Sequence, residues 1–218
     1  LHQFESARLS AGELKEAIQF YQKNQGFHFT SSEYPLLREN TQQDVLGSFF
    51  NLDKTTPPNI VIIVVEGLSK DFSGANAYAG SFTPFLDHLS TKSLVLVTYM
   101  FADDCLKNFF KQYEKRSDFK NTIFFIMGDH HIGSFPSTNG LDDYHVPFIV
   151  YSQMLKAPKK FYSISTHNNV APTITNLILN NYPNLKTRPS QVHWLTDVID
   201  TSVNFRNRNS MPFMEWSR

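Results

Sequence analysis

The sequence predicts an α/β fold with a mainly parallel central sheet. Two short apolar runs, residues 60–65 and 123–127, are rich in Ile, Val and Phe, and a glycine closes each run within two residues. Such runs are typical of buried strands, and the first has the composition of a central strand buried on both faces. Residues 103–115 between them have helical apolar spacing. A strand–helix–strand order favours a parallel pairing of the two strands.

Further elements follow the same periodicities. We expect helices over 11–23, from Thr83 and Pro84 onward, and over 170–181, with strands over 93–97 and 145–151. Thr83 is the expected N-cap residue of its helix. Pro147 indicates a strand start or a sheet edge, because proline donates no ladder hydrogen bond. Asp103 stands near the start of its own helix, where a negative charge complements the helix dipole.

The composition is that of a globular protein. The chain has 218 residues, with 41% hydrophobic and 18% charged, and 20 basic residues balance 20 acidic ones. Without a basic excess we expect no nucleic-acid partner. The single cysteine, Cys105, excludes an internal disulfide, and its place in an amphipathic helix predicts a buried, inert thiol. No apolar run reaches the roughly 20 residues of a membrane helix.

Ionisable residues follow both apolar runs directly. Glu66 ends the first run, and Asp129 and His130 come after Gly128 at the end of the second. Carboxyl ends of parallel strands meet at one edge of a sheet, where open α/β sheets bind their ligands. Two carboxylates and an imidazole suit a divalent metal. Glu66 has an alternative role as a helix cap, and an Asp-His pair can simply end a strand.

Five motifs occur in the order seen in the alkaline phosphatase/sulfatase superfamily. They are VVEGLS at 64–69, TPFLDHL at 83–89, GDH at 128–130, HVPFIVY at 145–151 and APTI at 171–174. Within that superfamily, the chain looks most like the lipoteichoic acid synthase branch of membrane-anchored phosphoglycerol transferases. The resemblance covers about residues 57–200.

This resemblance implies an organisation for the chain. Helices would flank both faces of the sheet, and residues 57–218 would form a sulfatase-like catalytic domain. Residues 1–56 would be an N-terminal helical linker to an upstream membrane anchor, outside the cytoplasm, in the periplasm or on the outer face of the cytoplasmic membrane. The strand at 93–97 runs almost directly into the helix at 103. We therefore expect a family segment to be missing near 96–99, and the domain to be truncated at its C-terminus.

The resemblance also assigns metal and nucleophile. Glu66, Asp129 and His130 would hold a divalent metal, Mn or Zn, with Mg or Ca as alternatives. The family's Thr or Ser nucleophile follows the strand that corresponds to 93–97, and Thr98 is the only hydroxyl in roughly that place.

Three further histidines are candidate substrate contacts: His131, His145 and His167. Two-metal relatives use a histidine near His167 as a ligand, whereas a role in capping the next helix is the alternative here. Family members commonly have aspartate where Asn169 stands, so a second metal is left open.

Three functions compete. The first is transfer of phosphoglycerol from a phospholipid head group to a glycan acceptor through a covalent Thr or Ser intermediate. The second is hydrolysis of soluble phosphate or sulfate esters by a phosphodiesterase or sulfatase; the stretch from Cys105 to Lys107 does not match the Cys/Ser-x-Pro-x-Arg motif of common sulfatases. The third is a non-enzymatic domain without a nucleophile, which would bind a glycan or a protein.

Overall fold

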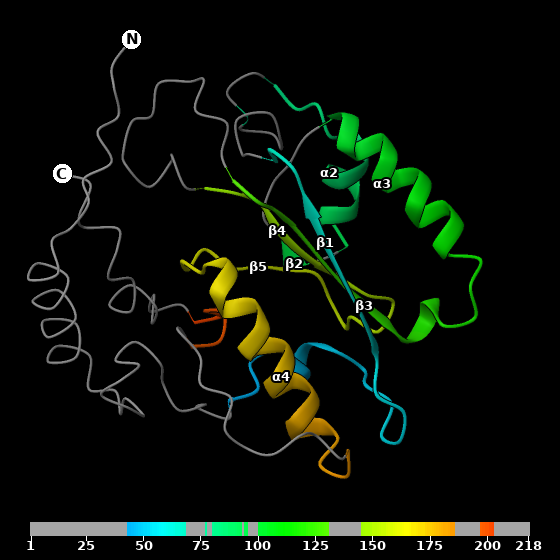
Figure 1. Cartoon of the computed structure of the whole chain (residues 1–218), viewed down its shortest axis with the longest axis vertical. Helices are drawn as coiled ribbons and strands as arrows, with labels where there is room; N and C mark the ends of the chain where they lie inside the picture. Colours follow the sequence, from blue (N-terminus) through cyan, green and yellow to red (C-terminus); the bar gives the residue numbers. More distant parts are fainter. Residues whose placement is uncertain are drawn as a thin grey trace, which may run out of the picture.

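A computed structural model describes residues 43–68, 77, 80–92, 94–95, 100–130, 145–185 and 197–202. The helix expected over 11–23 lies outside these residues. The described part contains one five-stranded sheet with helices packed against it (Figure 1). The strands are β1 (Asn59–Val65), β2 (Leu94–Val95), β3 (Thr122–Gly128), β4 (Phe148–Tyr151) and β5 (Lys159–Lys160). The α-helices are α2 (Pro84–Ser90), α3 (Met100–Tyr113) and α4 (Val170–Asn181), and the 3-10 helices are η1 (Gly47–Phe49), η3 (Phe119–Asn121) and η5 (His167–Asn169).

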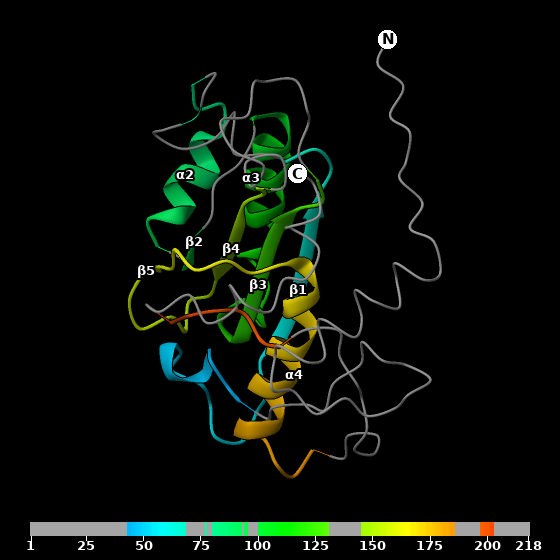
Figure 2. The same cartoon turned by 90° about the vertical axis from the view of Figure 1, so that its left-hand side faces the viewer.

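The strands lie in the order β1-β3-β4-β2-β5, which Figure 2 shows from right to left. β1 pairs with β3 and β2 with β5 in parallel, whereas β4 is antiparallel to both of its neighbours. The α/β class is therefore confirmed, and the sheet is mixed because β4 runs against the other four strands. An apolar run predicts a strand but carries no information about its direction.

The position of β1 differs from the expectation. Within the described residues, β1 is an edge strand rather than a central one. The sequence predicts that both faces of this strand are buried. Ile62 and Val64 are 53% and 56% exposed, however, so one face of β1 is open to solvent. The strand that is buried on both faces is β3, which lies between β1 and β4, and all seven of its residues are buried.

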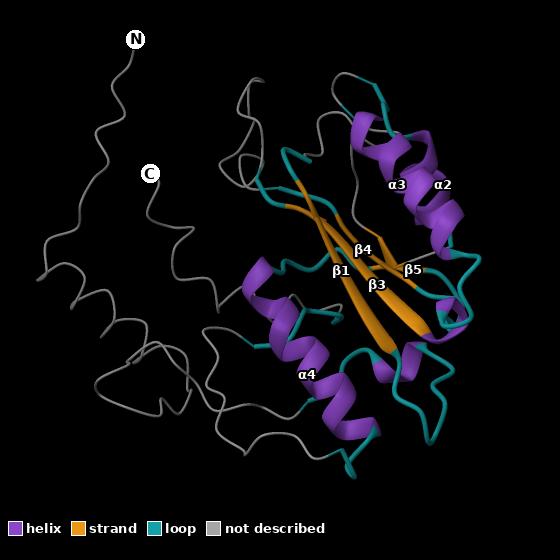
Figure 3. Ribbon diagram, turned by 45° about the vertical axis from the view of Figure 1, so that its right-hand side comes forward, coloured by secondary structure: helices purple, strands orange, loops and turns teal. Residues whose placement is uncertain are grey.

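Alternating side chains of β3 divide the core into two layers. Ile123, Phe125 and Met127 pack with Val170 and Leu177 of α4. Phe124 and Ile126, on the other face of β3, pack with buried side chains of α2 and α3; these are Leu86, Leu89, Leu106 and Phe110. Figure 3 shows α4 on one side of the sheet and α2 with α3 on the other. This follows from the period of two in a strand, which gives β3 two apolar faces.

The helices agree closely with the sequence expectations. α4 has the expected bounds, and α3 begins three residues earlier than expected. Cys105, however, is exposed on α3, so the prediction of a buried thiol is wrong. Leu106 and Phe110 form the buried stripe of the helix, and Cys105 lies outside it. Within the described residues, no helix is both long and apolar enough to cross a membrane.

A buried carboxylate joins α2 to α3. Asp103, 1% exposed, accepts hydrogen bonds from the backbone N–H groups of Phe85 (2.7 Å) and Leu86 (2.6 Å) in the first turn of α2. Thr83 occupies the expected N-cap position, but its side chain makes no capping hydrogen bond. Asp103 therefore caps the neighbouring helix as well as standing in the first turn of its own.

Replacing this carboxylate should loosen the helix pair. We expect Asp103→Ala to lower the free energy of unfolding by about 3 kcal/mol, because two buried N–H groups lose a charged acceptor. Asp104→Ala, at the exposed neighbouring position, is the matched control and should change it by less than about 0.5 kcal/mol. Urea unfolding followed by circular dichroism measures both values. Equal losses in the two variants would contradict the capping role of Asp103.

Candidate metal centre

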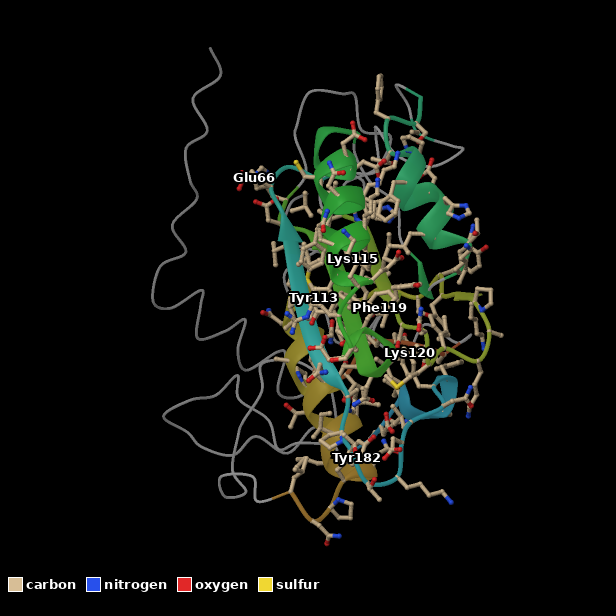
Figure 4. All side chains as sticks on the ribbon, turned by 90° about the vertical axis from the view of Figure 1, so that its right-hand side faces the viewer. Glu66, Tyr113, Lys115, Phe119, Lys120 and Tyr182 are labelled. Atoms are coloured by element: carbon tan, nitrogen blue, oxygen red, sulfur yellow. The ribbon has the colours of Figure 1, made fainter. Side chains whose placement is uncertain are left out.

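Glu66, Asp129 and His130 meet at the carboxyl ends of β1 and β3. The parallel register pairs Val65 with Gly128, so Glu66 and Asp129 are the next residues on two adjacent strands. One ligand atom from each of the three side chains lies within 4.8 Å of the others. Figure 4 shows Glu66 at the end of β1. The strand register thus brings together the three residues that the sequence singles out.

The imidazole of His130 stands between the two carboxylates. Its Nε2 lies 3.1 Å from Glu66 Oε1 and 3.4 Å from Asp129 Oδ2. The side chains of Glu66 and His130 are exposed, whereas that of Asp129 is partly covered. The three donors therefore converge on one point that is open to solvent.

Backbone N–H groups hold Asp129 in place. Its Oδ1 accepts hydrogen bonds from the N–H of Gly67 (2.7 Å) and from its own neighbour His130 (2.7 Å). Gly67 has a φ of 66°, in the left-handed region that glycine adopts without a steric penalty. Partial burial by itself raises the pKa of Asp129, but these N–H groups and the nearby imidazole outweigh it, so the pKa lies below its ordinary value. Asp129 is consequently ionised at neutral pH, with Oδ2 directed toward His130.

Glycine at the end of β3 allows a close approach of the backbone. A Cβ atom on Gly128 would overlap the backbone carbonyl oxygen of Leu68, which follows Gly67 in the turn after β1. Leu68 itself is fully buried. This close approach packs the turn that holds Gly67 directly against the segment that holds Asp129. The sequence shows Gly128 only as a strand end, since the contact is with a residue 60 positions away.

His167 reaches the same end of β3 from η5. Its Nε2 lies 2.5 Å from the carbonyl oxygen of Gly128, the residue before Asp129. It is not part of the three-residue cluster. The capping box before α4 is made by Thr166 and Asn169, so His167 does not have the capping role considered as its alternative.

The side chain of Asn169 has a structural role. Its Oδ1 accepts the N–H of Thr166 (2.6 Å), its Nδ2 donates to the carbonyl oxygen of Asp197 (2.6 Å), and the residue is buried. These bonds use both ends of the amide. Asn169 therefore offers no free ligand atom for a second metal.

The remaining predicted site residues are placed as follows. Thr98 and His131 lie outside the described residues. His145 is exposed two residues before Pro147, which directly precedes β4 and confirms the proline as a strand start. Among the described histidines, only His130 joins the cluster with Glu66 and Asp129. Sequence reasoning did not identify Gly67, whose N–H orients Asp129; its only signal is that a glycine follows Glu66.

Two comparisons with known proteins found a similarity. The Sulfatase family model matches residues 96–180, fewer than half of the chain, and this range contains Asp129 and His130 but not Glu66. A solved structure of a protein in the alkaline phosphatase superfamily from Vibrio parahaemolyticus is similar, with a TM-score of 0.55 and 11% identity over 78% of this chain and 76% of that chain. At this identity the likeness concerns the fold. No curated protein matches the chain. Together these findings support the alkaline phosphatase/sulfatase superfamily.

The packing at Gly128 can be tested by adding one methyl group. We expect Gly128→Ala to lower the free energy of unfolding by about 2 kcal/mol, because Leu68 must move, and to speed amide exchange of Gly67. Gly80→Ala is the control: its Cβ would meet nothing within 4 Å, although its φ of 86° carries a cost of about 1 kcal/mol. Hydrogen exchange read by NMR should show Gly67 unchanged in that control. If both variants affect Gly67 equally, the close packing of the two segments is refuted.

Proposed function

We propose that the chain binds one divalent metal through Glu66, Asp129 and His130 and uses it to cleave or transfer a phosphate or sulfate ester. The observation that carries this proposal is the convergence of the three ligand atoms within 4.8 Å at the carboxyl edge of β1 and β3. The family match and the fold support phosphate or sulfate ester chemistry.

The donor set fits such a metal. Two carboxylates and one imidazole suit Mn or Zn, and the imidazole makes Mg or Ca the less favoured alternatives. The lowered pKa of Asp129 keeps a charged ligand available, and its Oδ1 is already oriented by two N–H groups. Three protein ligands leave positions open for substrate, which is the pattern of catalytic rather than structural sites.

The metal and the residues of the chain would have different roles in the reaction. When bound, such a metal polarises an ester oxygen and lowers the pKa of a coordinated hydroxyl. The residues themselves have positioning tasks: Gly67 and the turn after β1 orient Asp129, and His167 holds the carbonyl of Gly128. His130 would contribute a neutral imidazole nitrogen, which requires that its Nε2 carry no proton.

The motif order and spacing support a narrower proposal. Here the substrate is a phospholipid head group, a hydroxyl forms a covalent intermediate, and phosphoglycerol passes to a glycan acceptor. Thr98 is the candidate nucleophile and falls inside the range matched by the Sulfatase family model. His131, His145 and His167 also fall inside it and are candidate substrate contacts. This proposal includes an upstream membrane anchor, residues 1–56 as linker and a location outside the cytoplasm.

Hydrolysis of soluble esters is the second candidate. The match to the Sulfatase family model supports it as much as the first candidate, because that match does not distinguish a lipid donor from a soluble ester. Both candidates require the same metal cluster. They differ in substrate, so the assays below separate them.

Removal of one ligand should weaken metal binding. We expect Asp129→Asn to lower the affinity for Mn²⁺ or Zn²⁺ by at least about tenfold, since a charged first ligand is lost. Asp104→Asn, an exposed carboxylate on α3 outside the cluster, makes the same charge change and should bind as the wild type does. Isothermal titration calorimetry of the metal alone measures both. An unchanged metal affinity in Asp129→Asn would show that Asp129 is not a metal ligand and would contradict the proposed site.

Activity should depend on the metal. We expect hydrolysis of a soluble p-nitrophenyl phosphodiester, or release of diacylglycerol from phosphatidylglycerol vesicles, to stop after EDTA treatment and to return on adding Mn²⁺. Diacylglycerol release without free glycerol phosphate would support the transferase, because the phosphoglycerol must then be held by the protein or passed to an acceptor other than water. Release of p-nitrophenol alone would support the soluble-ester hydrolase. Metal binding without either activity would indicate a non-enzymatic binding domain.

A further inference from the structure

One face of β1 carries two exposed apolar side chains. The alternation of side chains along a strand puts Ile60, Ile62 and Val64 on the same face. Ile60 packs against the core cluster that includes α4, whereas Ile62 and Val64 are 53% and 56% exposed. This apolar patch, Ile62 with Val64, therefore lies on the α4 face of the sheet, at the unpaired edge of β1.

The flank of α4 next to this patch is also partly open. On the opposite flank, the hydroxyl of Thr173 accepts a hydrogen bond from the N–H of Ile199, in the segment 197–202 that Figure 2 shows running from α4 toward β5. Helical periodicity puts Ala171 and Ile178 on the flank toward the β1 edge. Ala171 is exposed and Ile178 is only partly buried. The patch and this flank thus form one apolar surface that is open to solvent.

The sequence of residues 11–23, which lie outside the described residues, has the complementary pattern. We expect these residues to form an amphipathic helix, whose apolar stripe consists of Leu14, Ala17, Ile18 and Tyr21. A helix of this length is marginal alone in water and needs an apolar surface for its stripe. It would be about 20 Å long, and the seven residues of β1 span about 23 Å, so the two elements match in length.

The connection to the described fold allows this contact. Val45, Leu46 and Phe50 pack in the core cluster of the α4 face, so the chain enters the fold on the face that carries the patch. The residues between 23 and 43 span up to about 60 Å when extended, more than twice the length of β1. A tethered helix has a roughly millimolar effective concentration at its site, which favours it over a second copy of the chain at micromolar concentration.

We propose that residues 11–23 form a helix that docks on Ile62 and Val64, beside α4. The contact removes the patch and the apolar stripe of the helix from water at the same time. The N-terminal part of the chain would then be a second helical layer on this face rather than only a linker. Val64 stands two residues before Glu66, so the docked helix would border the candidate metal centre; only this consequence rests on the proposed function.

Thiol modification of the full chain tests this contact. Val64→Cys puts a thiol on the patch, and the native Cys105, exposed on α3 at the other face of the sheet, is an internal reference (Figure 3). Reaction with a small maleimide is followed at each position by peptide mass spectrometry. We expect the thiol at position 64 to react at least about tenfold more slowly than Cys105, because reaction requires the helix to detach.

Substitutions in the expected helix identify what covers the patch. Ile18→Glu puts a charge in the apolar stripe and should raise the rate at position 64 about tenfold, and the milder Ile18→Ala should raise it less. Gln19→Glu is the matched control: it adds the same charge on the polar face of the expected helix and should leave the rate unchanged. A thiol from Val150→Cys, at a position that is 1% exposed, should stay unreactive with Ile18→Glu, which excludes global unfolding.

Three outcomes would overturn the proposal. Fast reaction at position 64 with the natural N-terminal sequence would show that the patch is uncovered. Equal protection in Ile18→Glu and Gln19→Glu would show that another segment covers it. Protection that increases with protein concentration would assign the patch to a second copy of the chain. Metal affinity and ester cleavage report separately on the proposed function.

Discussion

The parallel pairing of β1 with β3 is the interaction on which the candidate site depends. Seven consecutive residue pairs run from Asn59 with Thr122 to Val65 with Gly128. A shift of one residue would turn every side chain of one strand to the other face. It would also separate Glu66 from Asp129. The register is held from both sides, since both faces of β3 are covered by apolar side chains of helices.

The segment that contains helix α4 contacts both ends of the β1–β3 pair. At its N-terminal side, His167 binds the carbonyl of Gly128, and at its other end the hydroxyl of Tyr182 donates to the carbonyl of Asp53, before β1 begins. In Figure 4, Glu66 accordingly lies at the upper end of β1 and Tyr182 lies below its lower end. The helix therefore ties the start of β1 and the end of β3 into one unit, while Asp103 does the same for α2 and α3 on the other face.

The candidate metal centre combines order and openness. Asp129 is fixed by two N–H groups and by the packing of Gly128 on Leu68, whereas Glu66 and His130 are exposed. A ligand set with one rigid member and two adjustable ones can accept a metal together with a substrate oxygen. The backbone turn after β1 is therefore the element that orders the site, and its Gly67 adopts the positive φ that this turn requires.

The sequence by itself determined the kind and approximate bounds of the main elements and the three residues of the cluster. Periodicity, caps and residues at strand ends are local, so they can be recognised without the fold. Only the tertiary structure decided that β1 lies at an edge of the described sheet, that β4 is reversed, that Asp103 caps α2 and that Cys105 is exposed. Each of these depends on contacts between residues far apart in the chain, and a local pattern does not encode which distant partner a strand edge or a carboxylate will meet.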